Sequence, residues 1–287
     1  MTKAYRIAGI DLLLHASQFH FAGLHPFEID PATVCDPIEL CFDAETQQPT
    51  EEHLLLDTFD FPDAEAICRL YKTAEGHLFT MSREGMAPCT FLVPKNGLAR
   101  CNFAADDNPS IFRFGLWITF NLRASARGVL AIHSSVLIHD SAAVLCLGES
   151  GTGKSTHTRL WREHIAGTEL LNDDSPMVAL RDGIATVYGS PWSGKTPCYR
   201  NLHYPIRGFL RLSQAPVNEI RKLSTLMAYG ALQPSMPPSF SYDAELFDRT
   251  NNLLSALLRQ VPVYHLRCLP NREAAELACQ TLYGETR

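Results

Sequence analysis

The sequence predicts a mixed α/β (α+β) protein with a β-rich N-terminal domain, residues 1–127, and a C-terminal α/β domain, residues 128–287. Short apolar runs separated by turn residues predict the first domain, and apolar residues at helical spacing predict helices in the second. The character of the sequence changes near residue 129. A chain of 287 residues, 46% of them hydrophobic, is long enough to bury a core in one large or two ordinary domains.

Five apolar runs in the first domain predict strands, at residues 4–14, 53–61, 66–73, 77–82 and 88–93. Gly-containing turn signals such as Glu75-Gly76 lie between them and favour hairpins. Apolar and aromatic residues at helical spacing then predict a helix from residue 110 to about residue 126. We expect this helix to end the domain and to pack its aromatic side chains on the sheet.

The second domain alternates strand and helix patterns. Strands are predicted at residues 129–132, 135–138 and 261–268, and the near-continuous apolar run 142–147 is typical of a strand buried on both faces. The Asp182-Gly183 turn predicts a hairpin between residues 177–180 and 184–188. Helices are predicted at residues 155 to about 165, 219–232, 243–260 and 271–282, the last two with an Asp or Asn cap.

Charge and composition exclude several classes of protein. Residues 1–127 carry 10 basic and 17 acidic side chains, a net charge of −7 that would repel a nucleic acid or an anionic membrane. The sequence contains no run of 18 apolar residues, so we expect no membrane-spanning helix. The nine cysteines contain no C-x-x-C pair, so we expect free thiols in a reducing cytoplasm rather than disulfides or a zinc site.

One motif carries chemistry. Residues 148–155 match G-x-x-x-x-G-K-[ST] and lie between a predicted buried strand and a predicted helix. Such a loop curls its backbone N–H groups around phosphate oxygens at the positive end of the helix dipole. Lys154 would reach the β and γ phosphates and Ser155 would bind Mg²⁺. The predicted nucleotide-binding residues are Gly148, Glu149, Ser150, Gly151, Thr152, Gly153, Lys154, Ser155 and Thr156.

Residues 189–196 match the same pattern but do not suit a phosphate cradle. Pro191 has no N–H group to donate, and Trp192 is bulky where a phosphate must come close. A structural turn is one interpretation of this segment. The other is a loop that presents Lys195 and Arg200 to substrate or phosphate.

Phosphoryl transfer also needs a carboxylate for the metal ion and a group that orients or deprotonates the acceptor. Asp173 and Asp174 are adjacent at the end of a short apolar run. Neighbouring side chains of an extended segment point to opposite sides, so one acid could face the metal and the other the acceptor. A solvated turn before Pro176 is the alternative.

The block from His133 to Asp174 resembles HPr kinase/phosphorylase and, more distantly, the nucleotide core of the ATP-dependent phosphoenolpyruvate carboxykinases. The shared pattern is a His before the loop strand, a G-x-S-G-x-G-K-[ST] loop and a following Asp-Asp pair. The resemblance implies a P-loop kinase core of the carboxykinase-like type. It also implies catalytic roles for Asp173, as base, for His133 beside the phosphates and for Lys154, with Asp174 and Ser155 at the metal.

These observations predict a kinase that uses ATP and Mg²⁺ to phosphorylate a hydroxyl acceptor, either a protein serine or a small molecule. A nucleotide-binding regulatory protein without phosphoryl transfer is the second hypothesis, and a carboxykinase-type enzyme is the third. The resemblance also suggests a homo-oligomer. Asp173→Asn would separate the first two hypotheses, because a sensor needs the metal but no catalytic base.

Overall fold

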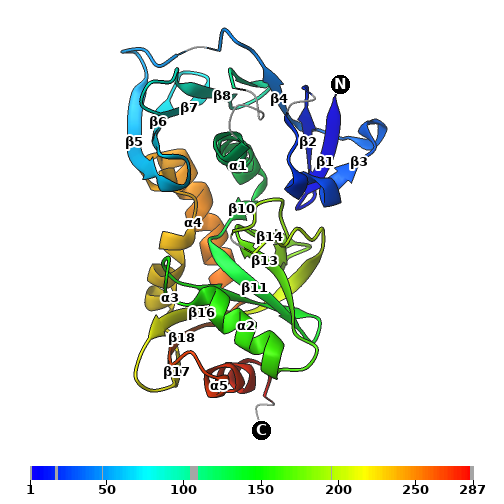
Figure 1. The fold of residues 1–287 in the computed structure, drawn as a ribbon, viewed down its shortest axis with the longest axis vertical. Coiled ribbons are helices and arrows are strands. Elements are labelled where there is room, and N and C mark those ends of the chain that lie inside the picture. The colour runs from blue at the N-terminus through cyan, green and yellow to red at the C-terminus, as the bar shows by residue number, and fades with distance from the viewer. Residues whose placement is uncertain (1, 17–18, 47, 104–108, 195, 285–287) are drawn as a thin grey trace. The chain divides into compact units, whose positions relative to one another are not determined.

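The computed structural model describes residues 2–16, 19–46, 48–103, 109–194 and 196–284. The chain forms two compact units, one of residues 1–128 and 237–249 and one of residues 129–236 and 250–287. Each unit has a large mixed β-sheet with helices, so the protein is of the α+β class (Figure 1). The sequence pattern places the first boundary within one residue of this division, but it assigns residues 237–249 to the second unit.

The first unit has a nine-stranded sheet in the order β3-β1-β2-β4-β9-β8-β7-β6-β5, with parallel pairing of β4 to β2 and to β9. Helix α1 (Pro109–Ala124) packs its apolar residues in this unit. The strands are β1 (Lys3–Ile7), β2 (Ile10–Leu14), β3 (Glu28–Ile29), β4 (Ile38–Phe42), β5 (Leu54–Phe61), β6 (Ala66–Lys72), β7 (Gly76–Ser82), β8 (Cys89–Pro94) and β9 (Ala99–Cys101).

The second unit has strands in the order β10-β14-β15-β16-β12-β11-β13, and β18 pairs with both β16 and β17. The strands are β10 (Leu130–Ala131), β11 (Ser134–His139), β12 (Ala142–Leu147), β13 (Glu169–Asp174), β14 (Met177–Arg181), β15 (Ile184–Tyr188), β16 (His203–Gln214), β17 (Glu219–Lys222) and β18 (Val263–Cys268). The helices are α2 (Lys154–His164), α3 (Thr225–Leu232), α4 (Ala244–Leu258), which begins in the first unit, and α5 (Arg272–Tyr283).

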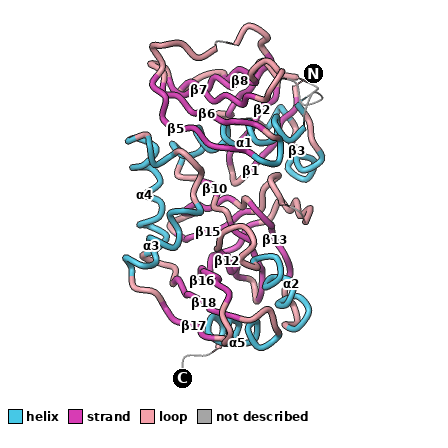
Figure 2. Tube along the Cα trace, turned by 60° about the vertical axis from the view of Figure 1, so that its left-hand side comes forward, coloured by secondary structure: helices cyan, strands magenta, loops and turns pink. Residues whose placement is uncertain are grey.

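Helices α2 and α5 share one hydrophobic core with strands β11, β12, β13, β16 and β18. Figure 2 shows both helices in the part of the chain that contains β12, β16 and β18. The indole of Trp161 on α2 is fully buried in this core, which also contains Ala275 and Ala278 of α5. Small residues on α5 allow the two helices to approach each other closely, and large apolar residues on α2 fill the space against the sheet. This core holds α2, and therefore the loop before it, against the ends of the strands.

Several predicted elements differ from the structure. The strand predicted over residues 4–14 is a hairpin of β1 and β2. A single helix over residues 219–232 is wrong: Glu219–Lys222 is strand β17, paired with β18, and only Thr225–Leu232 is helical. The sequence also gives no indication of β16, although this strand lies at the centre of the second sheet. Pro205 and Gly208, which ordinarily mark loops, lie inside β16, and its pairing with three other strands outweighs their local preference.

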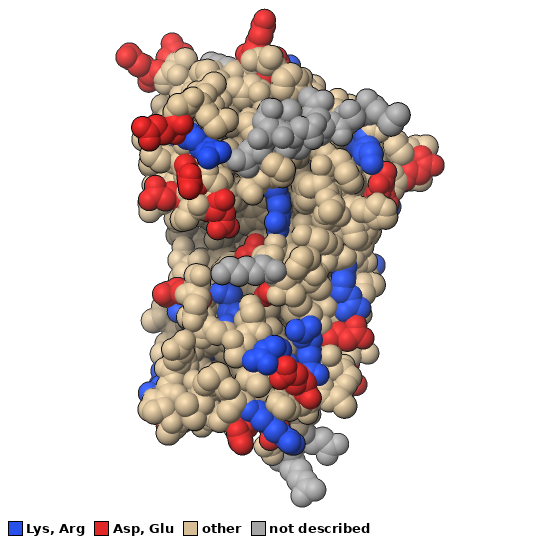
Figure 3. All heavy atoms as spheres, viewed as in Figure 1, with Lys and Arg blue, Asp and Glu red and all other residues tan. Residues whose placement is uncertain are grey.

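The acidic excess of the first unit is visible on one face, where acidic side chains gather over the part containing β5 to β7 (Figure 3). Among the described residues, the helices are too short or too polar to cross a lipid bilayer.

Candidate functional site

The Gly-rich loop connects β12, which is buried over nearly its whole length, to the start of α2. Gly153 precedes the helix with a φ of 101°, a left-handed conformation that glycine adopts without strain. The first intrahelical bond runs from the N–H of His157 to the carbonyl of Gly153, at 2.8 Å. The N–H groups of the first turn, which begins at Lys154, therefore have no acceptor within the helix and can bind an anion.

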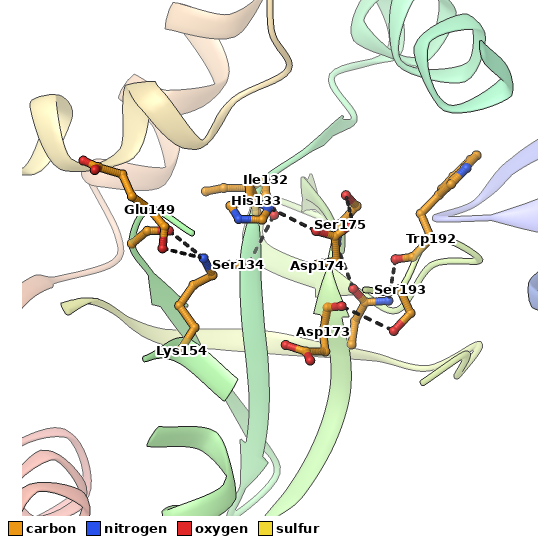
Figure 4. Close-up of polar contacts among 12 residues, drawn as sticks. Ile132, His133, Ser134, Glu149, Lys154, Asp173, Asp174, Ser175, Trp192 and Ser193 are labelled. Atoms are coloured by element: carbon orange, nitrogen blue, oxygen red, sulfur yellow. Dashed lines mark hydrogen bonds and ion pairs between the residues drawn. The ribbon is translucent and has the colours of Figure 1, made fainter. Parts of the chain in front are cut away.

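Lys154 folds back over this loop. Its Nζ atom donates to the carbonyl of Gly148 at 2.6 Å and to the carbonyl of Glu149 at 3.2 Å (Figure 4). Burial lowers the pKa of Lys154, while Asp174 and Asp173 act in the opposite direction. The negative charges of both acids thus favour the protonated ammonium form of Lys154.

The two acids at the end of β13 face different partners. The Ser155 hydroxyl lies 3.5 and 3.4 Å from the two carboxylate oxygens of Asp173, a side chain that is only 7% exposed. Pairing of β13 with β11 brings Asp173 opposite Ser135 and so places it beside the N-terminus of α2. The predicted opposite orientation of neighbouring acids in an extended segment agrees with this arrangement.

The carboxylate of Asp174 contacts the imidazole of His133 instead. Its Oδ1 atom lies 3.2 Å from Nδ1 of His133, and both side chains are well exposed, at 36% and 46% (Figure 4). The backbone N–H of His133 donates to the carbonyl of Ser235, and the Ser175 hydroxyl donates to Oδ2 of Asp174 at 3.1 Å. Asp174 has a φ of 147°, which is unusual for a residue with a side chain. The pair is therefore held from several sides but is open to an incoming molecule.

The second segment that matches the loop pattern begins at Gly189 and is called the second Gly-rich segment here. Its residues Ser193 and Gly194 pack against the backbone of the two acids. Asp174 and Ser193 form an antiparallel bridge, and the N–H of Gly194 donates to the carbonyl of Asp173 at 2.5 Å. A Cβ atom on Gly194 would lie 3.0 Å from that carbonyl oxygen and 3.3 Å from Cβ of Asp174. This close approach explains why residue 194 is a glycine without any need for a bound phosphate. It agrees with the interpretation that this segment is not a phosphate cradle.

A buried amide, Asn172, joins this segment to β13. Its Nδ2 atom lies 3.2–3.4 Å from the carbonyls of Ser190, Trp192 and Cys198, and its Oδ1 atom accepts from the N–H of Ser175 at 3.1 Å. Asn172 is fully buried, so these groups have no access to solvent water as a substitute. The sequence Asn172-Asp173-Asp174 thus combines a buried amide that holds the loop with one buried acid and one partly exposed acid.

Of the two residues predicted to contact substrate or phosphate, Arg200 is within the described part of the chain. Arg200 forms an ion pair with Glu169 at 2.7 Å and donates to the carbonyl of Leu170 at 2.9 Å, at the start of β13. Asp174 is five residues away along that strand, roughly 16 Å. The charge of Arg200 is thus already paired with Glu169, and its contact with substrate or phosphate stays a prediction. Lys195 lies outside the described residues.

Arg211 is a residue near the loop that the motif does not identify. It lies on β16 directly beside Leu147, the last residue of β12, and its guanidinium is 3.4 Å from the carboxylate of Glu149. The charge of Arg211 contributes to the lowered pKa of Lys154. Only the parallel pairing of β12 with β16 reveals this proximity, and that pairing depends on a strand that the sequence pattern does not indicate.

A pocket of about 640 Å³ adjoins the loop. Its walls come from residues 151–153, from one face of α2 and from the ends of β16 and β18. This volume lies within the range of about 300–1,000 Å³ that is usual for small-molecule sites. The phosphate loop, the acids and a cavity thus occur together in the second unit.

The oxygen atoms of Ser155 and Asp173 suit Mg²⁺, which prefers hard oxygen ligands. Two neighbouring ligands of an octahedral magnesium ion are about 3.0 Å apart, close to the separation found here. Within the described residues no group of three or more His, Cys, Asp or Glu side chains gathers around one point. A magnesium ion bound here would therefore take its remaining ligands from phosphates and water.

Comparisons with protein-family models and with curated proteins find no match to this chain.

Proposed function

We propose that this protein is a kinase that transfers the γ-phosphoryl group of ATP, bound with Mg²⁺, to a hydroxyl acceptor. The observation that carries the proposal is the position of the Ser155 hydroxyl, at the start of α2, 3.4–3.5 Å from the buried carboxylate of Asp173. A glycine loop with its lysine can bind any anion. A hydroxyl and a carboxylate beside it add the metal-binding pair that phosphoryl transfer requires.

The contacts favour a particular division of roles. Ser155 and Asp173 would hold the magnesium ion, which neutralises charge on the phosphates, and Lys154 would move from its loop carbonyls to the β and γ phosphates. The accessible pair of Asp174 and His133 would face the acceptor. The family resemblance assigns the two acids the other way round, so the assignment is itself part of what the experiment tests.

In the proposed reaction, the acceptor oxygen forms a bond to the γ-phosphorus while the bond from that phosphorus to the bridging oxygen of ADP breaks. The hydroxyl proton passes to the Asp174 carboxylate. His133 orients that carboxylate through the contact of 3.2 Å between Nδ1 and Oδ1. Most of the rate acceleration would come from positioning and from electrostatic stabilisation of the phosphates.

The test compares three variants in binding of ATP, with and without Mg²⁺, and in transfer from γ-labelled ATP to components of a cell lysate. Lys154→Ala should lose ATP binding. Asp173→Asn should lose the additional affinity that Mg²⁺ provides, and Asp174→Asn should keep that affinity but lose transfer. Unchanged ATP affinity in Lys154→Ala would refute the site. Full transfer by both Asn variants would refute the roles given to the two acids, and no transfer by the unmodified protein would refute the kinase.

A nucleotide-dependent regulatory protein is the second candidate. It would use the same loop and the pair of Ser155 and Asp173. The contact between Asp174 and His133 at the acceptor side would have no role in it. For such a protein, Asp174→Asn should change neither nucleotide binding nor any downstream response. Turnover of nucleotide that depends on oxaloacetate would instead indicate a carboxykinase-type reaction.

A further inference from the structure

The pocket beside the phosphate loop begins where the loop ends. Residues 151–153 form its rim, and Thr156, His157 and Leu160 line it from one face of α2, three and four residues apart. Leu212 on β16 and Cys268 on β18 also line it. A molecule with its phosphates on the N–H groups of the loop would therefore have its other end beside a largely apolar cavity.

One buried polar group in this pocket has an unused hydrogen-bonding atom. His157 is 3% exposed, and its Nε2 atom accepts a hydrogen bond of 2.9 Å from the indole N–H of Trp161. Because an indole only donates, Nε2 must be unprotonated, and the hydrogen of the neutral ring must be on Nδ1. Nδ1 has no hydrogen-bond partner among the described residues.

We infer that this pocket binds the nucleobase of the phosphoryl donor, with Nδ1–H of His157 donating to a ring nitrogen or carbonyl of the base. The inference rests on the proposed function and deepens it, because it says where the base of the nucleotide binds and which side chain recognises it. Leu160, Leu212 and Cys268 supply apolar surface for a planar base. His157 supplies a donor whose orientation is set by Trp161 in the core.

The experiment measures the affinity of the whole protein, with Mg²⁺, for ATP, GTP and tripolyphosphate, which has the phosphates but no base. Leu269→Trp would fill the pocket, since Leu269 lines it with a side chain that is 38% exposed. ATP affinity should fall at least tenfold, and tripolyphosphate affinity should remain within twofold. Leu226→Trp, at an 82% exposed position outside the pocket, is the matched control and should change neither affinity.

A second measurement uses the unmodified protein. Cys268 lines the pocket, and burial raises the pKa of its thiol, so alkylation should be slow and is best followed at alkaline pH. ATP should slow alkylation of Cys268 at least fivefold, whereas tripolyphosphate should not, and the exposed Cys35 should react equally in all samples. Comparison of ATP with GTP then shows which base the pocket prefers.

The outcomes separate the two proposals. If tripolyphosphate binds as tightly as ATP and neither Leu269→Trp nor alkylation distinguishes them, the base-pocket inference is refuted while the phosphate site stands. If neither ligand binds, the proposed function is refuted and the inference with it.

Discussion

Removal of the Asn172 amide tests whether this side chain holds the second Gly-rich segment against the acids. Asn172→Ala deletes an acceptor for the N–H of Ser175 and a donor for the loop carbonyls, among them that of Ser190. The N–H of Ser175 and at least one carbonyl would be left buried and unpaired. Each unsatisfied group costs roughly 1–3 kcal/mol, so we expect a loss of about 2–6 kcal/mol in the free energy of unfolding.

Urea denaturation followed by tryptophan fluorescence measures this loss, because Trp161 and Trp192 are both buried in the second unit. Asn102→Ala in the first unit is the matched control, since Asn102 also accepts from a backbone N–H, that of Thr90, and donates to a backbone carbonyl. We expect Asn172→Ala to weaken the binding of Mg²⁺ and ATP together, and Asn102→Ala to leave it unchanged.

A loss below about 0.5 kcal/mol in Asn172→Ala would refute this reasoning. It would mean that the segment is held by its other contacts, such as the hydrogen bond from the Ser190 hydroxyl to the carbonyl of Ser175. A large loss of stability with unchanged ligand binding would show that the segment supports the fold but does not position the acids.

Three further changes test the electrostatics and packing of the chain. Burial lowers the pKa of His157 from 6.5 to about 4 on folding, so between these pH values the unfolded chain binds a proton that the folded chain does not. The contribution of His157 to the unfolding free energy should therefore be full above pH 6.5 and should fall by about 3 kcal/mol toward pH 4. Denaturation experiments on His157→Phe should lack this pH dependence. Gly194→Val should push the segment away from Asp173 and weaken Mg²⁺-dependent ATP binding severalfold, as calorimetry would measure. Lys72→Met should lower the unfolding free energy of the first unit by about 1–3 kcal/mol in thermal denaturation, because it leaves the buried carboxylate of Asp243 without the cation 2.6 Å away.

Local sequence signals predicted the elements that depend on local chemistry. The Asp182-Gly183 hairpin is confirmed, with both residues in the left-handed conformation that the turn requires. The cap of α5 is confirmed as well, since Asn271 accepts from the N–H of Ala274. The strand, loop and helix around Lys154 form as the motif predicts, because each part has its own strong local pattern.

Features that depend on pairing between distant segments could not be predicted from the sequence. Strand β16 contains Pro205 and Gly208, and its place in the sheet comes from strands far away in the chain. The alternation rule predicted that Asp173 and Asp174 face different groups, but only the register of β13 on β11 decides which acid faces Ser155. The proximity of Arg211 to the loop has the same origin.

The return of residues 237–249 to the first unit has a practical consequence for work on isolated parts of the chain. A recombinant fragment beginning at residue 128 would include these thirteen residues but omit Lys72, so the fully buried carboxylate of Asp243 would lose its counterion. Such a fragment would carry an orphaned stretch at the start of α4 that favours aggregation. Expression of the second unit by itself therefore requires that residues 237–249 be removed and that residues 236 and 250 be joined by a linker. The unfolding free energy of a fragment cut only at residue 128 would not represent that of the second unit in the whole protein.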